Sequence, residues 1–271
     1  MDFVSFPVLV LRTLVVAGLK ARGSPVFLET HLNRFSLNAL LEIWYLGAYD
    51  NLDPGPGGTV IDLGANVGDF TLKASRWVGD KGVVIAVEPV REHLVVLKRN
   101  LDRNRISNVT IVEKAIGESN GHIHVDGQEF ETTSIDEIVA ELGLTHVNSI
   151  KVDIEGAELL AMHEGLRTIK RAKHISAETH SHSLFRDVTS LLESEGYHVY
   201  CPSLSMLTAR MSRRILRNPG PFLLTEAART RSWSSAGPPF LMSIQKWLLG
   251  KHKPDWFSQS SGLALLCADH N

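Results

Sequence analysis

The sequence predicts an α/β protein in which helices cover both faces of a mostly parallel β-sheet. From residue 59 to residue 202, short β-branched apolar runs alternate with segments of helical spacing, and strands separated by helices favour parallel pairing. The chain has 271 residues, of which 44% are hydrophobic and 21% charged, and this composition is that of an ordinary globular protein. The two cysteines stand in no metal-binding spacing, which argues against a zinc site or a disulfide framework.

Short apolar runs predict the strands, and a glycine, a proline or an acidic residue follows most of these runs. The strands cover residues 59–63, 83–87, 109–112, 149–154, 175–179, 197–201 and 262–267. Apolar residues three and four apart predict helices over residues 70–78, 93–101, 157–169 and 184–192. Ser134 and Glu137 form a capping box that predicts another helix, and the turn formers of residues 117–121 predict a hairpin before Ile123.

A run of proline and glycine at residues 53–58 is the strongest turn signal of the chain, and we interpret it as a boundary. It separates an N-terminal helical preface, residues 1–58, from the main domain, residues 59–202. Residues 203–271 form a basic C-terminal extension or lid that includes the last strand. The net charges of these three parts are −1, −7 and +6. The extension is therefore expected to contact an anionic partner or the acidic main domain.

The extension has several interpretations that the sequence leaves open. Residues 203–258 hold most of its basic side chains, and Arg210 to Arg217 have the spacing of an amphipathic helix. Such a helix lies on anionic lipid, forms a lid over an active site, or presents a solvated charged face at the edge of the sheet. Contact with RNA is a further alternative, although the net charge of −2 argues against a general nucleic-acid-binding protein.

The amino-terminal segment, residues 3–19, is apolar but is interrupted by Pro7 and Arg12. It is therefore a poor signal peptide and a marginal membrane span. We interpret it as a helix packed on the domain, with membrane-surface contact as the alternative. Together with the cysteine usage this predicts a cytoplasmic protein, and peripheral contact with an anionic membrane stays open. The oligomeric state is not determined by the sequence.

Two strand ends carry residues that suit a nucleotide-like cofactor. The first predicted strand ends in a G-x-x-x-G pattern, Gly64 and Gly68, where a cofactor can lie on the backbone at a helix start. Asp62 places a carboxylate beside it, which suits a cationic amino group better than a pyrophosphate. Glu88 ends the next strand, where an acid can accept both hydroxyls of a ribose. The alternatives are a tight strand–helix connection for the glycines and a helix-start carboxylate for Glu88.

These motifs and others resemble, in the same order, the FkbM-type S-adenosylmethionine-dependent methyltransferases, which are class I enzymes. The shared motifs between residues 59 and 201 lie at residues 62–68, 87–89, 115–117, 134–136, 150–158 and 196–197. The segment Lys-x-Asp-x-Glu-Gly-Ala-Glu at residues 151–158 is the most family-specific of them. The resemblance implies a seven-stranded Rossmann-like sheet, S-adenosylmethionine as the methyl donor, and O-methylation of a sugar or polyketide hydroxyl.

The resemblance also implies a cofactor site. Its residues are Asp62, Gly64, Asn66, Gly68, Glu88, Ala115 and Ile116. The two glycines and Asn66 would line the methionine and ribose portions, and Asp62 would hold the amino group directly or through water. Glu88 would accept the ribose hydroxyls, and Ala115 with Ile116 would form the adenine wall. The chain departs from many relatives in having Asp69, not an aromatic residue, after the last glycine.

Methyl transfer to a hydroxyl needs a proton acceptor at the strand tips. The candidates are Asp153 and Glu155 after one strand, and Glu178, His180 and His182 after the next. We predict His180 as the base, because a neutral imidazole near pH 7 is well matched to the task, with Asp153 or Glu155 orienting it or the substrate. Surface histidines without a role are one alternative. A divalent cation held by these same acids and histidines is another, although we assign no metal ion to the protein.

The function predicted from the sequence is O-methylation of a hydroxyl on a glycan, glycolipid or related small-molecule metabolite. The fourth strand ends without the Asn/Asp-Pro-Pro-aromatic tetrad of amino methylation, and neither cysteine lies in a Pro-Cys motif for cytosine methylation. An RNA 2′-O-methyltransferase and a non-catalytic cofactor-binding module are the alternatives. The missing G-x-G-x-x-G argues against an NAD-dependent oxidoreductase.

Overall fold

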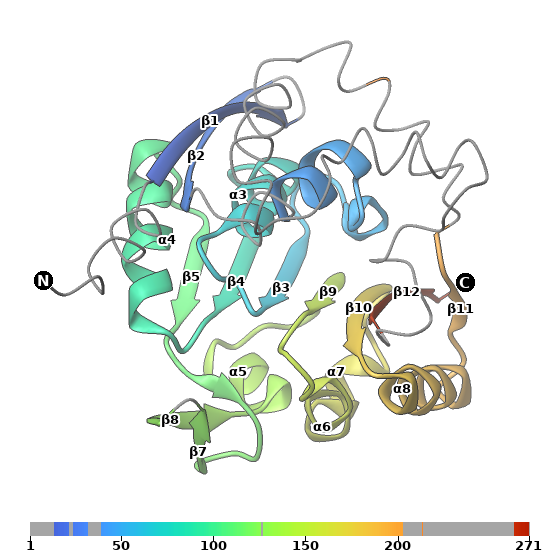
Figure 1. Cartoon of the computed structure of the whole chain (residues 1–271). Helices are drawn as coiled ribbons and strands as arrows, with labels where there is room; N and C mark the ends of the chain where they lie inside the picture. The colour runs from blue at the N-terminus through green and yellow to red at the C-terminus, as the bar shows by residue number, and fades with distance from the viewer. Residues whose placement is uncertain are drawn as a thin grey trace, which may run out of the picture.

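The computed structural model describes residues 14–21, 24–31, 39–125, 127–202, 213 and 263–270. Its centre is a seven-stranded sheet in the order β11-β12-β10-β9-β3-β4-β5 (Figure 1). The strands are β3 (Thr59–Leu63), β4 (Val83–Val87), β5 (Val109–Val112), β9 (Ser149–Val152), β10 (His174–His180), β11 (His198–Tyr200) and β12 (Leu263–Asp269). All neighbours from β10 to β5 pair in parallel, and β12 is antiparallel to both β10 and β11. The predicted fold class and the predicted last strand are therefore confirmed.

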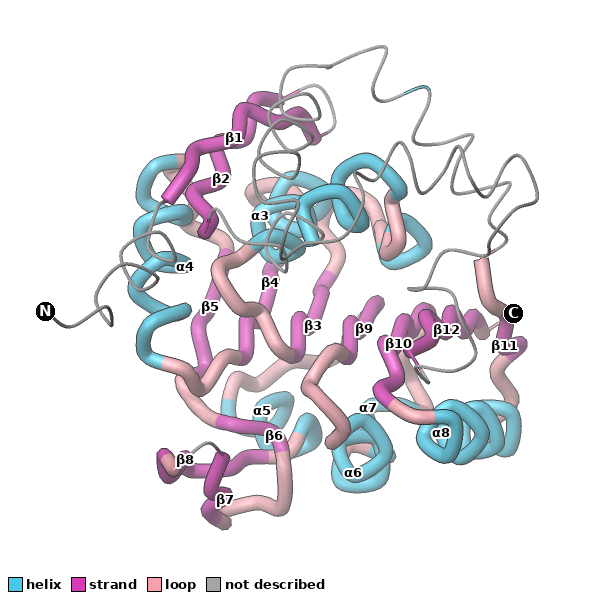
Figure 2. The backbone as a smooth tube through the Cα atoms, in the orientation of Figure 1, coloured by secondary structure: helices cyan, strands magenta, loops and turns pink. Residues whose placement is uncertain are grey.

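Helices cover both faces of this sheet, as the alternating pattern predicts. One face carries α3 (Asp69–Val78) and α4 (Arg91–Arg103). The other carries α5 (Ile135–Glu141), α6 (Glu158–Glu164), α7 (Leu166–Ile169) and α8 (His182–Ser194) (Figure 2). Successive strand residues serve opposite cores, because Val60 packs with the α3 side and Ile61 with the α5–α8 side. Both faces of the central strands are therefore buried, which explains their continuous apolar sequences.

The predicted helical preface is wrong for residues 14–31, which form the antiparallel hairpin of β1 (Leu14–Ala21) and β2 (Ser24–His31). In β2, Val26 and Leu28 are 0% exposed while Phe27 between them is 46% exposed, so burial alternates as in a strand. All three residues are apolar, and such a run does not distinguish a strand from a helix. Among the described residues between β2 and β3, helical structure is limited to residues 39–40, to η1 (Leu41–Leu46), a π-type helix, and to η2 (Asp50–Leu52), a 3₁₀ turn.

The hairpin is joined to α4 by side-chain amides that pair with the backbone of β2. Asn100 Oδ1 accepts from the Glu29 N–H at 2.7 Å, and its Nδ2 donates to the carbonyls of Glu29 and Val67, each at 2.8 Å. Asn104, one turn later, exchanges the same pair of hydrogen bonds with Phe27. Because Val67 belongs to the loop after β3, Asn100 connects the hairpin to the predicted cofactor loop.

Asn100→Ala is expected to lower the free energy of unfolding by about 2–4 kcal/mol, because three buried backbone groups lose their partners. Asn100 is 0% exposed, so water does not replace those hydrogen bonds. Chemical denaturation measures the loss, and amide hydrogen exchange of β2 is expected to accelerate. The exposed Asp102→Ala on the same helix is the control, with an expected change of less than about 0.5 kcal/mol. Equal stability losses in the two variants would contradict this account of the docking.

Three further predictions differ in detail from the structure. The hairpin of this region joins β7 (His122–Val125) to β8 (Gln128–Thr133), so its turn lies after residue 125 and not at residues 117–121. The short strand β6 (Ala115–Ile116) pairs in parallel with β8. The predicted helix 157–169 divides into α6 and α7 at Gly165, where a Cβ atom would lie 2.7 Å from Ile135. β9 ends at Val152, two residues earlier than predicted.

No helix in the described parts of the chain is long and apolar enough to cross a membrane. The predictions made for residues 3–13 and for the basic segment 203–258 lie outside the described residues, with the exception of Arg213.

Candidate active site at the carboxyl ends of the strands

The loop that follows β3 adopts backbone conformations that explain its glycines. Gly64 and Gly68 have φ angles of 77° and 94°, and Asn66 between them has 49°. A Cβ atom on Gly64 would lie 1.9 Å from the carbonyl oxygen of Asp153, and one on Gly68 would lie 2.6 Å from Leu97. The glycines are thus needed first for close packing of the loop against the β9 loop and α4. Asn66, between the two glycines, is exposed.

Glu88 lies at the end of β4, is 4% exposed, and holds this loop in place. Its Oε2 accepts a hydrogen bond from the Asn66 N–H at 2.8 Å, and its Oε1 accepts one from the Val90 N–H at 2.9 Å. The ring of His93 lies 3.1 Å from Oε1. Val90 is the N-cap of α4, so Glu88 also acts as a carboxylate at a helix start, as the alternative interpretation predicted. It supports the glycine loop and the start of α4 at the same time.

Asp62 and Lys151 form a buried ion pair beneath the loop. The β3–β9 register sets the two residues side by side, and Lys151 Nζ lies 3.2 Å from Asp62 Oδ1. The hydroxyl of Thr71 donates to Asp62 Oδ2 at 2.6 Å. Asp62 is 0% exposed and paired with Lys151, and the role implied for it, holding the amino group of a cofactor directly or through water, stays a prediction. In this structure it anchors β3 to β9 and α3.

Lys151 joins Asp62 to the next strand tip. Its Nζ lies 3.5 Å from Asp153 Oδ2 and donates to the Gly64 carbonyl at 3.1 Å. Burial alone lowers the pKa of Lys151, but the charges of Asp62 and Asp153 outweigh it and raise the pKa above its ordinary value. The side chain is therefore a permanent cation that holds Asp153 against the glycine loop.

Asp153, Glu178 and His180 come together at the ends of β9 and β10, with one potential ligand atom of each within 4.8 Å of the others. Tyr49 donates from its hydroxyl to Glu178 Oε2 at 3.1 Å. Glu158, which is 0% exposed, lies with its Oε1 2.8 Å from His180 Nδ1. Each member of this cluster is therefore oriented by a second side chain. We call Asp153, Glu178 and His180 the strand-tip cluster.

The prediction of a neutral His180 is wrong for the protein without substrate. The hydrogen bond to Glu158 raises the pKa of His180 to about 9, with burial opposing it and Glu155 and Asp153 adding to the rise. Although burial raises the pKa of Glu158, its hydrogen bonds with His180 and the Gly156 N–H lower it overall. His180 is consequently an imidazolium at pH 7, which donates hydrogen bonds and does not accept a proton.

Glu178, and not His180, is the member of the cluster with a pKa near neutrality. Burial, followed by the charge of Asp153, raises the pKa of Glu178 to about 7, while His180, Tyr49 and Lys151 act in the opposite direction. Burial also raises the pKa of Tyr49 well above its ordinary value, so its hydroxyl stays a donor. A carboxyl group that titrates near neutrality in a cluster of this kind is a candidate acid–base residue.

The remaining predicted residues are placed less centrally. The Glu155 side chain is 89% exposed, and its Oε2 lies 3.5 Å from His180 Nε2, at the rim of the strand-tip cluster. His182 is exposed at the start of α8 and is not part of the cluster. Ala115 and Ile116 are 4% and 6% exposed in β6. Their role as the adenine wall stays a prediction.

Sequence reasoning did not assign Lys151, Glu158 or Tyr49 to the site. A lysine within a strand predicted to be buried was a usable signal, because a buried ammonium needs carboxylate partners. Glu178 and His180 are two residues apart on β10 and so share one face of the strand. Tyr49 comes from the segment before β3, and no local pattern connects it with Glu178.

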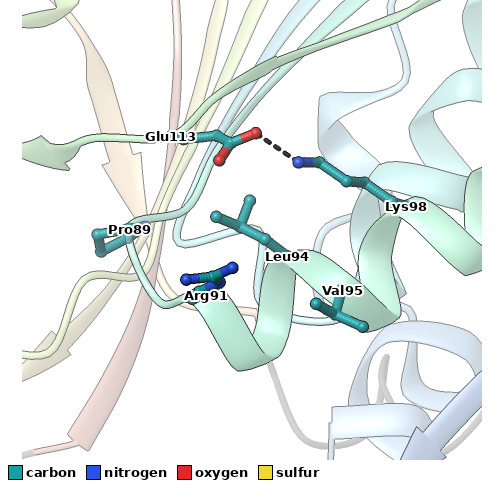
Figure 3. Close-up of a pocket in the computed structure, with 6 residues that line it drawn as sticks. All are labelled: Pro89, Arg91, Leu94, Val95, Lys98 and Glu113. Atoms are coloured by element: carbon teal, nitrogen blue, oxygen red, sulfur yellow. Dashed lines mark hydrogen bonds and ion pairs between the residues drawn. The ribbon is translucent and has the colours of Figure 1, made fainter.

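A separate cleft of about 450 Å³ lies between α4 and the segment after β5 (Figure 3). It is lined by Pro89, Arg91, Leu94, Val95, Lys98 and Glu113. The half-exposed side chains of Lys98 and Glu113 form an ion pair across it. None of the predicted site residues lines this cleft, so it is distinct from the strand-tip cluster.

The chain is similar to several proteins that are named as methyltransferases. A probable cobalt-precorrin-6B C(15)-methyltransferase from Sulfurisphaera tokodaii is 25% identical over 118 residues, which are 42% of this chain and 62% of the relative. The chain thus matches less than two thirds of that relative's length. Precorrin-6y C5,15-methyltransferase from Geobacter metallireducens has 18% identity and a TM-score of 0.43, covering 58% of this chain and 72% of that chain. Aeropyrum pernix fibrillarin, solved with S-adenosylmethionine, has 14% identity and a TM-score of 0.43, covering 70% and 76%.

The family is shown by a match that covers most strands of the sheet and the strand tips described above. Residues 62–199, about half of the chain, match the methyltransferase FkbM domain. The matched range includes the glycine loop, Glu88, Lys151 and the strand-tip cluster. The chain therefore belongs to the FkbM methyltransferase domain family.

Proposed function

We propose that this methyltransferase methylates a hydroxyl group of a glycan, glycolipid or related small-molecule metabolite, with Glu178 as the proton acceptor. The observation that carries the proposal is the strand-tip cluster, in which burial raises the pKa of Glu178 to about 7. A base with a pKa near the working pH combines the correct protonation state with a useful affinity for the proton. The cluster lies next to the glycine loop, since Gly64 packs against the Asp153 carbonyl.

The residues around the glycine loop fit S-adenosylmethionine. A carboxylate offers about four acceptor positions, so Glu88 can accept ribose hydroxyls in addition to its bonds with Asn66 and Val90. The Oδ1 atom of Asp69, directly after the loop, is buried and has no hydrogen-bond partner among the described residues. When bound, S-adenosylmethionine supplies a methyl group already activated by its sulfonium, so the protein has mainly to position the acceptor and remove its proton.

Glu88→Ala is expected to weaken binding of S-adenosylhomocysteine by about 100-fold or more, because the ribose hydroxyls lose a charged acceptor and Asn66 loses its support. Isothermal titration calorimetry measures the dissociation constant. The control is Glu92→Ala, which changes an exposed residue in the first turn of α4 and is expected to bind the ligand like the wild type. Unchanged binding by the Glu88 variant would remove Glu88 from the cofactor site.

The other residues of the cluster prepare Glu178 and the acceptor. The Tyr49 hydroxyl donates to Glu178 Oε2, which leaves Oε1 to take the hydroxyl proton. His180, held protonated through Glu158, lies with its Nε2 3.5 Å from Glu155 and 3.9 Å from Asp153. We assign Asp153, Glu155 and His180 to placing the acceptor.

The charges of the cluster support a hydroxyl-rich acceptor over RNA. Carboxylates accept hydrogen bonds from sugar hydroxyls, and the imidazolium of His180 donates to sugar oxygens. The phosphates of RNA would approach Asp153 and the exposed Glu155, which repel them. A neutral or cationic glycan, glycolipid head group or metabolite fits this surface better.

The proposal is tested with isotope-labelled S-adenosylmethionine and a panel of acceptors. The panel contains oligosaccharides, glycolipids, hydroxylated small metabolites and an RNA oligonucleotide. We expect label in a methyl ether of a sugar or metabolite, identified by mass spectrometry and NMR. Transfer to carbon or nitrogen would refute O-methylation. Labelling of RNA alone, with a steep salt dependence, would favour the RNA methyltransferase instead.

A further inference from the structure

Asp69 is a buried acid that none of the interactions described above explains. It is the first residue of α3, directly after Gly68, and it is 5% exposed. Among the described residues, no group donates a hydrogen bond to its Oδ1. Burial raises the pKa of Asp69 to about 7, with Lys151 lowering it and Asp62 adding to the rise. A buried carboxylate without a cationic partner is costly to the protein, so its retention needs a reason.

No cation of the described residues is available to Asp69. Lys151 acts on it electrostatically, but the Lys151 ammonium is already engaged by Asp62 at 3.2 Å, by the Gly64 carbonyl at 3.1 Å and by Asp153 at 3.5 Å. The start of α3 contributes partial positive charge, and the Asp69 backbone N–H supports the carboxylate. Neither supplies a full counter-charge to Oδ1.

Asp62, which the resemblance implied for the amino group of the cofactor, already has a cationic partner in Lys151. Thr71 donates to one of its oxygens at 2.6 Å, and Lys151 lies 3.2 Å from the other. Its side chain is 0% exposed. An ammonium group arriving at the loop would have to displace Lys151 to reach it. Asp69 needs no such displacement, because none of the ion pairs among the described residues includes it.

We propose that Asp69, and not Asp62, accepts the α-ammonium group of S-adenosylmethionine at the end of the glycine loop. An ammonium donates three hydrogen bonds and carries the charge that the buried carboxylate lacks. This assignment rests on the proposed cofactor site and names the residue that recognises the amino-acid part of the ligand. The helix start, which in other nucleotide sites favours an anion, is converted here into a site that favours a cation.

The test compares two ligands that share the thioadenosine but differ in the amino-acid part. S-adenosylhomocysteine carries the ammonium, and 5′-methylthioadenosine lacks it. We expect Asp69→Asn to weaken the binding of S-adenosylhomocysteine by about 10–100-fold. The affinity for 5′-methylthioadenosine is expected to change by less than about twofold, and calorimetry measures both dissociation constants. The exposed Asp80→Asn, which removes the same charge beyond the far end of α3, is expected to leave both affinities unchanged.

The outcomes separate this inference from the proposed cofactor site. Equal affinity of wild type and Asp69→Asn for S-adenosylhomocysteine would overturn the inference and leave the cofactor site intact. Equal weakening of both ligands would also overturn it, because Asp69 would then support the loop and not the ammonium. Asp69→Ser, with its fold checked by retained 5′-methylthioadenosine binding, repeats the test with a smaller side chain. A wild-type protein that binds neither ligand would refute the cofactor site, and the inference with it.

Discussion

Replacing Lys151 by methionine is expected to lower the free energy of unfolding by about 3–5 kcal/mol, which corresponds to a fall in melting temperature on the order of 10 °C. The substitution leaves the Asp62 carboxylate, which is 0% exposed, without its cation. Asp153 loses the same cation, and the Gly64 carbonyl loses a donor. Methionine fills a volume similar to that of the lysine stem, so little packing is lost. The expected loss of stability therefore comes from the buried charge that is left without a partner.

The matched control is Lys173→Met, which removes an exposed lysine from the turn before β10. It is expected to change the stability by less than about 0.5 kcal/mol. The double variant Lys151→Met/Asp62→Asn is expected to recover part of the loss, because the neutral amide still accepts from Thr71. No recovery in the double variant would show that the charge of Asp62 is not the cause.

Glu178→Gln is expected to lower turnover by about 10²–10⁴-fold once an acceptor is identified, because the hydroxyl proton loses its acceptor. Cofactor binding is expected to stay within about twofold of the wild type, since Glu178 does not contact the glycine loop in the described hydrogen bonds. Steady-state kinetics with the exposed Glu193→Gln on α8 as control measures the effect. Turnover retained by the Glu178 variant would remove it from the role of base.

The same assignment determines how the rate depends on pH. A base acts when deprotonated, so the wild-type rate is expected to rise with pH through about 7, the pKa to which burial and Asp153 raise Glu178. Tyr49→Phe removes a hydrogen bond that lowers this pKa, so the midpoint is expected to move to higher pH. If a neutral His180 were the base, Tyr49→Phe would not move the midpoint of the pH dependence. That result would contradict the assignment of Glu178 as the base.

Local sequence was sufficient to predict most of the sheet. The strands β3, β4 and β5 begin and end at the predicted residues, because their Val and Ile runs are interrupted by strong turn formers. The segment of residues 14–31 was predicted wrongly. Its apolar runs are too short to distinguish the period of a strand from that of a helix, and the turn signal between them, Gly23-Ser24-Pro25, was missed.

The candidate site was predicted in its location more than in its chemistry. The carboxyl ends of parallel strands meet at one edge, so Asp153 and His180 were expected close together, and they are. The protonation of His180 depends on Glu158, which reaches the strand tips from α6, and that of Glu178 depends on Tyr49, which comes from the segment before β3. No spacing in the sequence relates these residues to one another.

The sequence by itself determined the elements of this protein, the glycine loop and the acids at the strand tips, because these follow from local periodicity and turn chemistry. Only the tertiary structure decided which of the acids carry a proton or a counter-charge. Asp62, Asp69 and Glu178 are all carboxylates near the strand ends, yet Asp62 pairs with Lys151, whereas burial raises the pKa of both Asp69 and Glu178 to about 7. Burial and partner charge set these differences, and both arise from strands that are far apart in the chain.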